Sequence, residues 1–382
     1  MQLDVNQVRE EFPILKESIY LNVGTVGISP QSVVERVLES IAYFETRGHL
    51  VWGECESRMN ESRKRMAQLL GASPEEIALT RNATDGTNLT INGLDWRKGD
   101  EILLSDHEHP SMLFPWTYLQ QKGDITLKRF GISRDSSETV ENVRNAITPK
   151  TRLLATSHVT SQHGVRVPVK EIATICREHG ILTHIDGAQA TGQFPIPVQE
   201  IGCDFYTGNI HKWLLGPKGT GFYYVRQERL DEVKPTWVGA GTGHFSDEDG
   251  LTPINQASRF ECGTLDFGKY AAISAILDWF ETLGWKNVEA HMRKLSGYLK
   301  AELEKIPNVT LYTPHTWQES SAMTTFSVAN MPCHEVSGQL WERDQILVRL
   351  VGEYDAVRIS TAVFNTKEEV DLLLKHIRDF AE

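Results

Sequence analysis

The chain has 382 residues, of which 40% are hydrophobic and 24% charged, and its formal net charge at pH 7 is −12. This length is sufficient for a large hydrophobic core in one or two domains. The negative charge argues against nucleic acid or an anionic membrane surface as the main partner. No apolar run is long enough to predict a transmembrane helix, and the first residues lack the pattern of a secretion signal.

The cysteines indicate a cytoplasmic protein without disulfides. They are odd in number, scattered and never spaced as Cys-x-x-Cys: Cys55, Cys176, Cys203, Cys262 and Cys333. His107 and His109 lie close together but have no second ligand cluster at metal-binding spacing. We therefore expect reduced thiols and no metal site.

The N-terminal part is predicted to be mostly helical. A short amphipathic helix within residues 1–19 should stop at Pro13, and longer helices are expected near 31–47 and 55–70. Between them, residues 20–30 contain glycines, which favour tight turns or close approach of the backbone to a ligand. An ordinary strand-to-helix loop and one wall of a substrate pocket both remain open for this stretch.

A candidate anion site follows. Ser73 and Glu76 have capping-box spacing and predict a turn before a strand at 77–80. Asn82 then begins a helix, whose free N–H groups and positive dipole end could hold a phosphate. Taken alone, simple N-capping by Asn82 or Thr84 is the better explanation.

Two further strands end in side chains that could bind a ligand. The strand at 101–105 leads to His109, and the carboxyl end of a strand is where open α/β sheets place ligands. An imidazole face could stack there on a pyridine ring, although a single histidine is more often packed or exposed. The strand at 181–186 ends in Asp186, and a carboxylate at a buried strand end needs a cationic or donor partner. A protonated pyridine nitrogen would be one.

The turn that contains Lys212 is the stretch around which the other candidate site residues are arranged. It follows a short apolar strand at 205–207 and contains His211 and Lys212 side by side. A lysine in a polar loop is usually only solvated. Here the apolar run 213–215 follows directly, and such surroundings would favour the neutral amine that Schiff-base chemistry requires.

Strands and helices alternate through the middle of the chain. The other expected elements there are strands at 125–130, 152–157 and 221–225 and helices at 137–147 and 169–179. This alternation predicts an α/β fold with a mostly parallel sheet covered on both faces. The Gly-rich stretch 238–250 is expected to be a plain loop, with a mobile substrate gate as the less favoured alternative.

The C-terminal part changes character. Its expected elements are helices near 269–284, 286–306 and 335–343, strands at 308–312 and 322–328, and a last helix that begins after Thr366. They predict a small α+β domain over 265–382, joined by 1–19, beside a large domain over 20–264.

Several of these motifs together resemble the class V aminotransferase family of pyridoxal-phosphate (PLP) enzymes. The motifs are Glu108-His109, Asp186-x-x-Gln189, Asn209-x-His211-Lys212, Glu261-x-Gly263-Thr264 and Arg358-x-Ser360. Each is weak alone, but the set is specific and extends from about Tyr20 to the C-terminus. The resemblance implies the PLP-dependent transferase fold, which is aspartate aminotransferase-like, with a seven-stranded, mostly parallel sheet in the large domain. The group includes cysteine desulfurases, cystine C–S lyases and isopenicillin N epimerase-like proteins.

The resemblance also implies roles around the ring of the cofactor. Lys212 would form the Schiff base with PLP and later act as the general base. Asp186 would keep the ring nitrogen protonated, His109 would stack on the ring, and Gln189 would contact the ring oxygen.

Further implied roles concern the phosphate. Ala83 and Thr84 would grip it, with His211 and, less securely, Asn209, because relatives more often have Ser or Thr at position 209. Thr264 would reach the phosphate bound by the neighbouring subunit, which implies a homodimer with shared sites.

The substrate is implied to be an amino acid whose carboxylate Arg358 anchors. Cysteine desulfurases carry a nucleophilic cysteine on a loop before this arginine, but the short segment 346–358 contains none. We therefore expect β-elimination by a C–S lyase acting on cysteine, cystine or an S-substituted cysteine. Epimerisation, transamination and desulfuration by another thiol, such as Cys262 or Cys333, remain alternatives. A non-catalytic PLP-binding protein is the alternative from a different class.

Overall fold

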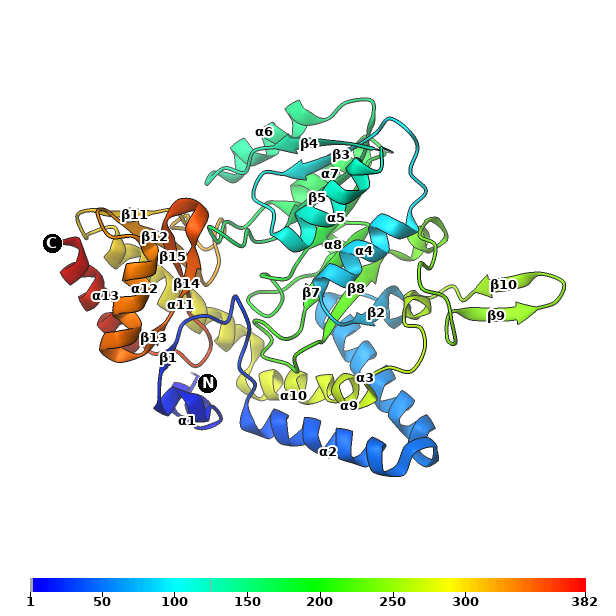
Figure 1. Ribbon diagram of the computed structural model, residues 1–382, viewed down its shortest axis with the longest axis horizontal. Coiled ribbons are helices and arrows are strands. Elements are labelled where there is room, and N and C mark those ends of the chain that lie inside the picture. Colours follow the sequence, from blue (N-terminus) through cyan, green and yellow to red (C-terminus); the bar gives the residue numbers. More distant parts are fainter. Residues whose placement is uncertain (1–2, 124) are drawn as a thin grey trace.

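The computed structural model describes residues 3–123 and 125–382 and contains two main sheets (Figure 1). The larger sheet lies in the middle of the view. The smaller one lies at the end that carries the C-terminus, and a two-stranded hairpin projects at the opposite end.

Seven strands form the large sheet in the order β2-β8-β7-β6-β5-β3-β4. In chain order they are β2 (Ile77–Thr80), β3 (Asp100–Ser105), β4 (Ile125–Phe130), β5 (Thr151–Ser157), β6 (Leu182–Asp186), β7 (Phe205–Asn209) and β8 (Gly221–Val225). Strands β3 to β7 are parallel to one another, whereas β8 is antiparallel to both β2 and β7. The prediction of a mostly parallel α/β sheet is confirmed.

Helices cover both faces of this sheet. Side chains alternate between the faces along each strand, so Leu103 joins one apolar cluster while Ile102 and Leu104 join the other. The first cluster includes α7 (Val169–Glu178), and the second includes α4 (Ala83–Gly93) and α5 (Pro110–Gln121). Helices α6 (Ser136–Ala146) and α8 (Val198–Ile201) complete this region. Because both faces are buried, the central strands are mostly buried, whereas the edge strand β4 has exposed residues.

The N-terminal helices agree with the prediction. The first helix, α1 (Val5–Glu10), ends before Pro13, and residues 1–2 of the predicted segment lie outside the described part of the chain. Two long helices follow, α2 (Gln31–Arg47) and α3 (Trp52–Leu70). They pack against α9 (Phe267–Ala271) and α10 (Ile273–Leu283) from much later in the sequence.

The small sheet has the order β11-β12-β15-β14 and is antiparallel throughout. Its strands are β11 (Val309–Leu311), β12 (Met323–Val328), β14 (Arg349–Val351) and β15 (Ala356–Ser360), and its helices are α11 (Trp285–Leu303), α12 (Cys333–Asp344) and α13 (Lys367–Ala381). Near the N-terminus, β1 (Ile19–Tyr20) pairs in parallel with β13 (Ile346–Leu347). The domain boundary near residue 264 stays a prediction.

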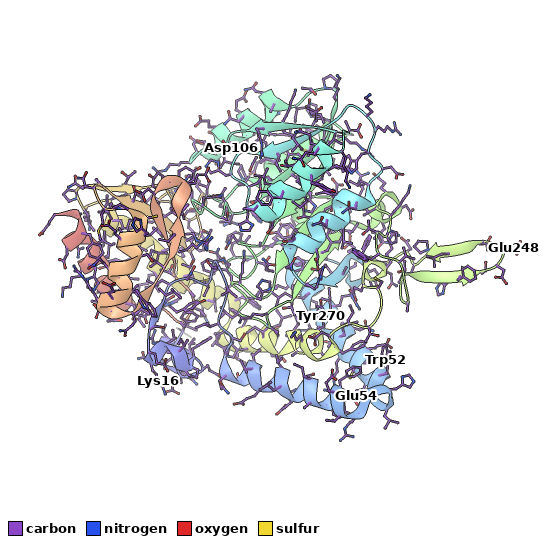
Figure 2. The ribbon with its side chains drawn as sticks, in the orientation of Figure 1. Lys16, Trp52, Glu54, Asp106, Glu248 and Tyr270 are labelled. Atoms are coloured by element: carbon purple, nitrogen blue, oxygen red, sulfur yellow. The ribbon has the colours of Figure 1, made fainter. Side chains whose placement is uncertain are left out.

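The stretch 238–250, which we expected to be a plain loop, leads into a hairpin. Strand β9 (Gly243–Ser246) pairs with β10 (Gly250–Pro253), with Phe245 opposite Leu251. Figure 2 labels Glu248 at the tip, far from the rest of the chain. Both apolar side chains are exposed, at 73% and 41% respectively.

No helix among the described residues combines the length and apolar character that a bilayer crossing requires.

Candidate functional site

The sequence-predicted cofactor residues converge on one cleft of about 350 Å³ at the carboxyl ends of the parallel strands. All of them except Thr264 line it: Ala83, Thr84, His109, Asp186, Gln189, Asn209, His211 and Lys212. In open α/β sheets, ligands bind at this edge. Thr264 lies outside the cleft, in an exposed bend after the 3₁₀ helix Ala257–Phe260.

Lys212 sits in the turn after β7 and is only partly exposed. Loss of water around its amine, together with the positive charges of Arg358 and Arg349, lowers its pKa to about 8, although Asp186 opposes the shift. An amine with this pKa is neutral far more often at neutral pH than an ordinary lysine. The expectation of a desolvated lysine is met, and its catalytic role stays a prediction.

Asp186 ends β6 and is buried. Its Oδ1 accepts the backbone N–H of Ala188 at 2.7 Å, and burial raises its pKa despite that bond and the charge of Lys212. A buried carboxylate with so little compensation favours a cationic N–H ligand. The protonated nitrogen of a pyridine ring supplies one.

Both the nitrogen and the oxygen of the Gln189 side-chain amide form hydrogen bonds. Its Nε2 donates to the carbonyl of Gly24 at 2.8 Å, and its Oε1 accepts the indole N–H of Trp213 at 2.9 Å. One amide hydrogen is left for a ligand. Trp213 thus connects Gln189 to the turn of Lys212.

The N-terminus of α4 points into the same cleft. Asn82 caps this helix by accepting the N–H of Asp85 at 3.0 Å, as predicted. The N–H of Ala83, however, already donates to Oδ1 of Asn209 at 2.8 Å. Asn209 therefore fastens α4 to β7, and only its amide nitrogen is left for the predicted phosphate contact.

The two histidines of the cleft are neutral donors or acceptors in this structure. His109 caps α5 by accepting the N–H of Ser111 on Nδ1 at 3.1 Å, and burial lowers its pKa to about 4. His211 directs Nδ1 at the carbonyl of Thr220 at 2.9 Å, and burial lowers its pKa as well. A neutral imidazole presents an uncharged face to a stacked ring.

Glu108 is a residue that the sequence motif contained but to which we assigned no role. It is buried and accepts hydrogen bonds from Ser105 Oγ, from Ser157 N–H at 2.9 Å and from Ser157 Oγ at 2.7 Å. These bonds join the ends of β3 and β5 beside His109. Burial raises the pKa of Glu108 to about 7.

Arg358 lies in β15, 5% exposed, and lines an adjoining cleft of about 260 Å³ that also reaches His109, Gln189 and Lys212. Its guanidinium donates to the Ser161 carbonyl and to Thr25 Oγ1, while its Nε has no partner. Within the described ranges no carboxylate pairs with it. A buried arginine in this condition favours a carboxylate ligand.

The same cleft contains charged residues to which the sequence analysis assigned no role. Arg349 stands opposite Arg358 in the register of β14 and β15, and Glu353 follows in the 3₁₀ turn Gly352–Tyr354. Both fell in the stretch that we interpreted only as a short loop. The glycine-rich segment 20–30 does line the clefts, through Gly24 and Thr25.

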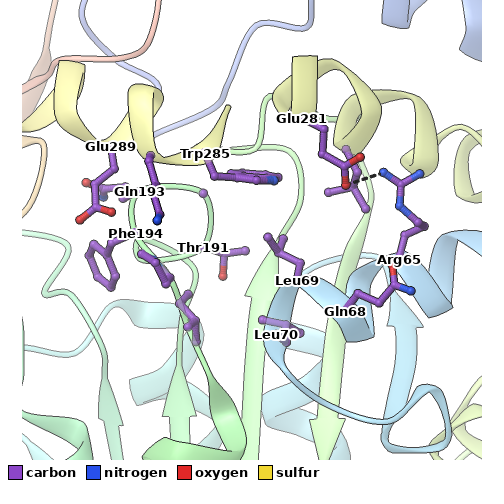
Figure 3. A pocket seen from close by; sticks show the side chains of 15 residues that line it. Arg65, Gln68, Leu69, Leu70, Thr191, Gln193, Phe194, Glu281, Trp285 and Glu289 are labelled. Atoms are coloured by element: carbon purple, nitrogen blue, oxygen red, sulfur yellow. Dashed lines mark hydrogen bonds and ion pairs between the residues drawn. The ribbon is translucent and has the colours of Figure 1, made fainter. Parts of the chain in front are cut away.

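A separate and more apolar cleft of about 340 Å³ lies between α3, the start of α11 and the loop after Gln189 (Figure 3). Its walls include Leu69, Phe194 and Trp285, and Arg65 pairs with Glu281 at one end. It contains none of the predicted site residues. In the described chain no cluster of three or more His, Cys, Asp or Glu is arranged to hold a metal ion.

Known proteins are similar to this chain over almost its whole length. The family model "Aminotransferase class-V" matches residues 19–373. A cysteine desulfurase of Shigella sonnei (strain Ss046) is 32% identical over 403 residues, which cover 98% of this chain and 97% of that protein.

Two solved structures are similar over almost the whole chain. The apo structure of a cysteine desulfurase from Thermococcus onnurineus NA1 has a TM-score of 0.91 at 28% identity, covering 100% of this chain and 98% of the other. The cystine C–S lyase C-DES in complex with its reaction product cysteine persulfide has a TM-score of 0.90 at 27% identity, covering 97% and 100%.

The chain therefore belongs to the class V aminotransferase family, has the PLP-dependent transferase fold, and is a PLP-dependent enzyme. The cleft fits this cofactor. It offers a desolvated amine for an aldehyde, a buried carboxylate for a pyridine nitrogen and a helix N-terminus for a phosphate.

Proposed function

We propose that this enzyme is a C–S lyase, which eliminates the sulfur substituent from Cβ of cysteine, cystine or an S-substituted cysteine. One observation carries the proposal. The cleft combines Lys212 with a buried, unpaired Arg358, and among the residues that line it or its neighbour there is no cysteine. The site can bind and deprotonate an amino acid, but it offers no thiol of its own to accept sulfur.

The residues divide the work as follows. PLP, when bound, supplies an electron sink that acidifies the Cα–H bond of the substrate. Arg358 holds the substrate carboxylate, and Lys212 Nζ removes the proton from Cα. Asp186 keeps a proton on the ring nitrogen. The Cβ–S bond then breaks, sulfur leaves with the electron pair, and the three-carbon remainder is hydrolysed to pyruvate and ammonium.

Desulfuration is the second candidate, since relatives about one third identical are cysteine desulfurases. That reaction needs a thiolate that attacks the substrate sulfur. Of the five free cysteines, Cys333 is buried in the small domain's apolar core, and Cys262, two residues before Thr264, lines neither cleft. The solved structures of a cysteine desulfurase and of a cystine C–S lyase are about equally similar to this chain, with TM-scores of 0.91 and 0.90. The lack of a cysteine in the lining of both clefts is what favours elimination.

The working enzyme is proposed to be a homodimer with shared active sites. Thr264 is exposed and lies outside its own chain's cleft, so its predicted phosphate contact would belong to a partner. The exposed Phe245 and Leu251 of the hairpin, and Trp237 at 73% exposure, offer apolar area for such a partner. A cytoplasmic location is supported by the free state of the cysteines.

Product analysis tests the proposed reaction. PLP-loaded enzyme is incubated separately with L-cysteine, L-cystine and an S-alkylcysteine, and pyruvate, ammonium and alanine are measured together. Pyruvate with ammonium supports elimination. Alanine with released sulfur would establish desulfuration, and the absence of both products would direct attention to epimerisation or transamination.

The assignment of Lys212 is tested by absorbance rather than by turnover. Lys212→Ala protein should lack the visible absorption band that covalently held PLP gives. A Lys218→Ala variant, which changes an exposed lysine six residues away in the same loop, is the control and should keep the band.

A further inference from the structure

The cleft beside Lys212 carries three charged side chains, Arg349, Arg358 and Glu353. Among residues 3–123 and 125–382, no ion pair involves any of them, although Arg349 and Glu353 are four residues apart. Unpaired charges of both signs around one cleft are available to a ligand with the opposite pattern. That ligand would bring two carboxylates and one ammonium group.

L-cystine carries two carboxylates and two amino groups. One amino group enters the reaction, so two carboxylates and one ammonium group are left for the charged side chains. The amino group that enters the reaction faces the cofactor and Lys212, and Arg358 takes the carboxylate of the same half. What is left is one carboxylate and one ammonium group on the leaving half. Cysteine or a simple S-alkylcysteine would leave Arg349 and Glu353 without a partner.

The spacing also fits. Arg349 and Arg358 are direct neighbours across β14 and β15, so their Cβ atoms are about 4.5–5.5 Å apart. The two Cα atoms of a disulfide-linked pair of cysteines are about 5.5–6 Å apart. A ligand with two carboxylates on such atoms is therefore of a size that two arginine side chains starting from neighbouring positions can both reach.

The turn that carries Glu353 is held in place. Tyr354 packs on His163 with the ring centroids 4.2 Å apart, and His163 in turn stacks on Tyr312 at 5.2 Å. His163 follows β5 of the large sheet, whereas Tyr312 adjoins the small sheet, so the turn is fixed from both sides. A carboxylate on a fixed turn at the cleft can select ligands.

We propose that Glu353 is a specificity-determining residue that binds the ammonium group of the leaving half of a disulfide substrate, opposite Arg349, which binds its carboxylate. The inference rests on the proposed lyase function and names the substrate class: the disulfide of cysteine with a second amino acid. Cleavage of Cβ–S then releases that second amino acid as its persulfide, with no oxidant or reductant required.

Three disulfides separate the two contacts. They are L-cystine, the mixed disulfide of cysteine with 3-mercaptopropionate, which lacks only the distal amino group, and the mixed disulfide with cysteamine, which lacks only the distal carboxylate. The kcat/KM for pyruvate formation is measured for each with the wild type, Glu353→Gln and Arg349→Gln. Glu342→Gln, an exposed glutamate on α12, is the control.

Glu353→Gln should lower kcat/KM about fivefold for cystine and for the cysteamine disulfide, mainly through KM, and should not lower it for the mercaptopropionate disulfide. Arg349→Gln should show the complementary pattern, with a smaller loss for the cysteamine disulfide than for the other two, because its effect on Lys212 is common to all three. Equal losses on all three disulfides, or no loss in Glu353→Gln, would overturn the assignment of Glu353. If wild-type enzyme released pyruvate from none of the three, the proposed function itself would fail.

Discussion

The surroundings of Lys212 disfavour its protonated amine, and the resulting low pKa can be measured without an activity assay. In the cofactor-free protein its pKa is about 8, lowered mainly by loss of water and further by Arg358 and Arg349. The reactivity of the amine toward acetic anhydride, followed by mass spectrometry across pH, should therefore rise through about pH 8. Arg358→Gln removes one positive neighbour and should shift the midpoint upward, whereas Asp186→Asn should shift it downward. A midpoint near 10 in the wild type would contradict the desolvated site.

Glu108 makes the stability of the fold depend on pH. Its pKa is about 7 in the folded protein, above that of an unfolded glutamate, because burial disfavours the charge. Between about pH 4.5 and 7 the folded state holds a proton that the unfolded chain releases, so this group's contribution to stability falls as pH rises. Relative to Glu108→Gln, the wild type should lose about 2–3 kcal/mol in unfolding free energy from pH 5 to 7.5. Urea unfolding at both pH values measures it, and a constant difference would exclude the effect.

At the scale of elements, the segment before α2 supports the turn of Lys212 directly. The N–H of Gly27 donates to the His211 carbonyl at 2.8 Å, and a Cβ at this position would lie 2.2 Å from the carbonyl oxygen of Lys212. Gly27→Ala should therefore cost about 1–3 kcal/mol of stability or displace the turn and weaken PLP binding. Gly53→Ala, which meets nothing within 4 Å, is the matched control. Urea unfolding and a PLP absorbance titration give both readouts, and equal behaviour of the two variants would refute the contact.

Most long elements were predictable because their signals are local. The capping box of Thr366 and Glu369 is formed, and Asn82 caps α4 as its position suggested. Strands β13 and β14 were missed because they are only two and three residues long, and β13 also depends on a distant partner, β1. The hairpin of β9 and β10 was missed because its polar and glycine-rich sequence carries a weak strand pattern.

At the scale of the whole molecule, the projecting hairpin predicts assembly. A two-stranded hairpin with exposed apolar side chains is marginal in water by itself. The double variant Phe245→Asp with Leu251→Asp should therefore shift the protein from dimer to monomer in sedimentation experiments. Trp341→Asp, on an exposed face of α12 at the other end of the molecule, should not. A wild-type monomer would contradict both the dimer and the proposed role of Thr264.

The site was predictable where chemistry and spacing coincide in the sequence. Asp186, Gln189, His211 and Lys212 lie within 27 residues and converge as expected. The contribution of Arg349 and Glu353 to the cleft was not predictable, because these residues reach it only when β14 pairs with β15 beside the large sheet. The hydrogen bond from Ala83 N–H to Asn209 was not predictable either, because it joins residues 126 positions apart.

The order of the site residues along the chain has a consequence for synthesis. All groups predicted to hold PLP within one subunit lie between residues 83 and 212, and their sheet is complete at Val225. Arg349, Glu353 and Arg358 leave the ribosome well after this sheet, and β1 must wait for β13 before it can pair. Because domains fold as the nascent chain emerges, the coenzyme's half of the pocket can form during translation. The half that recognises the amino acid is completed later, after Arg358 has emerged.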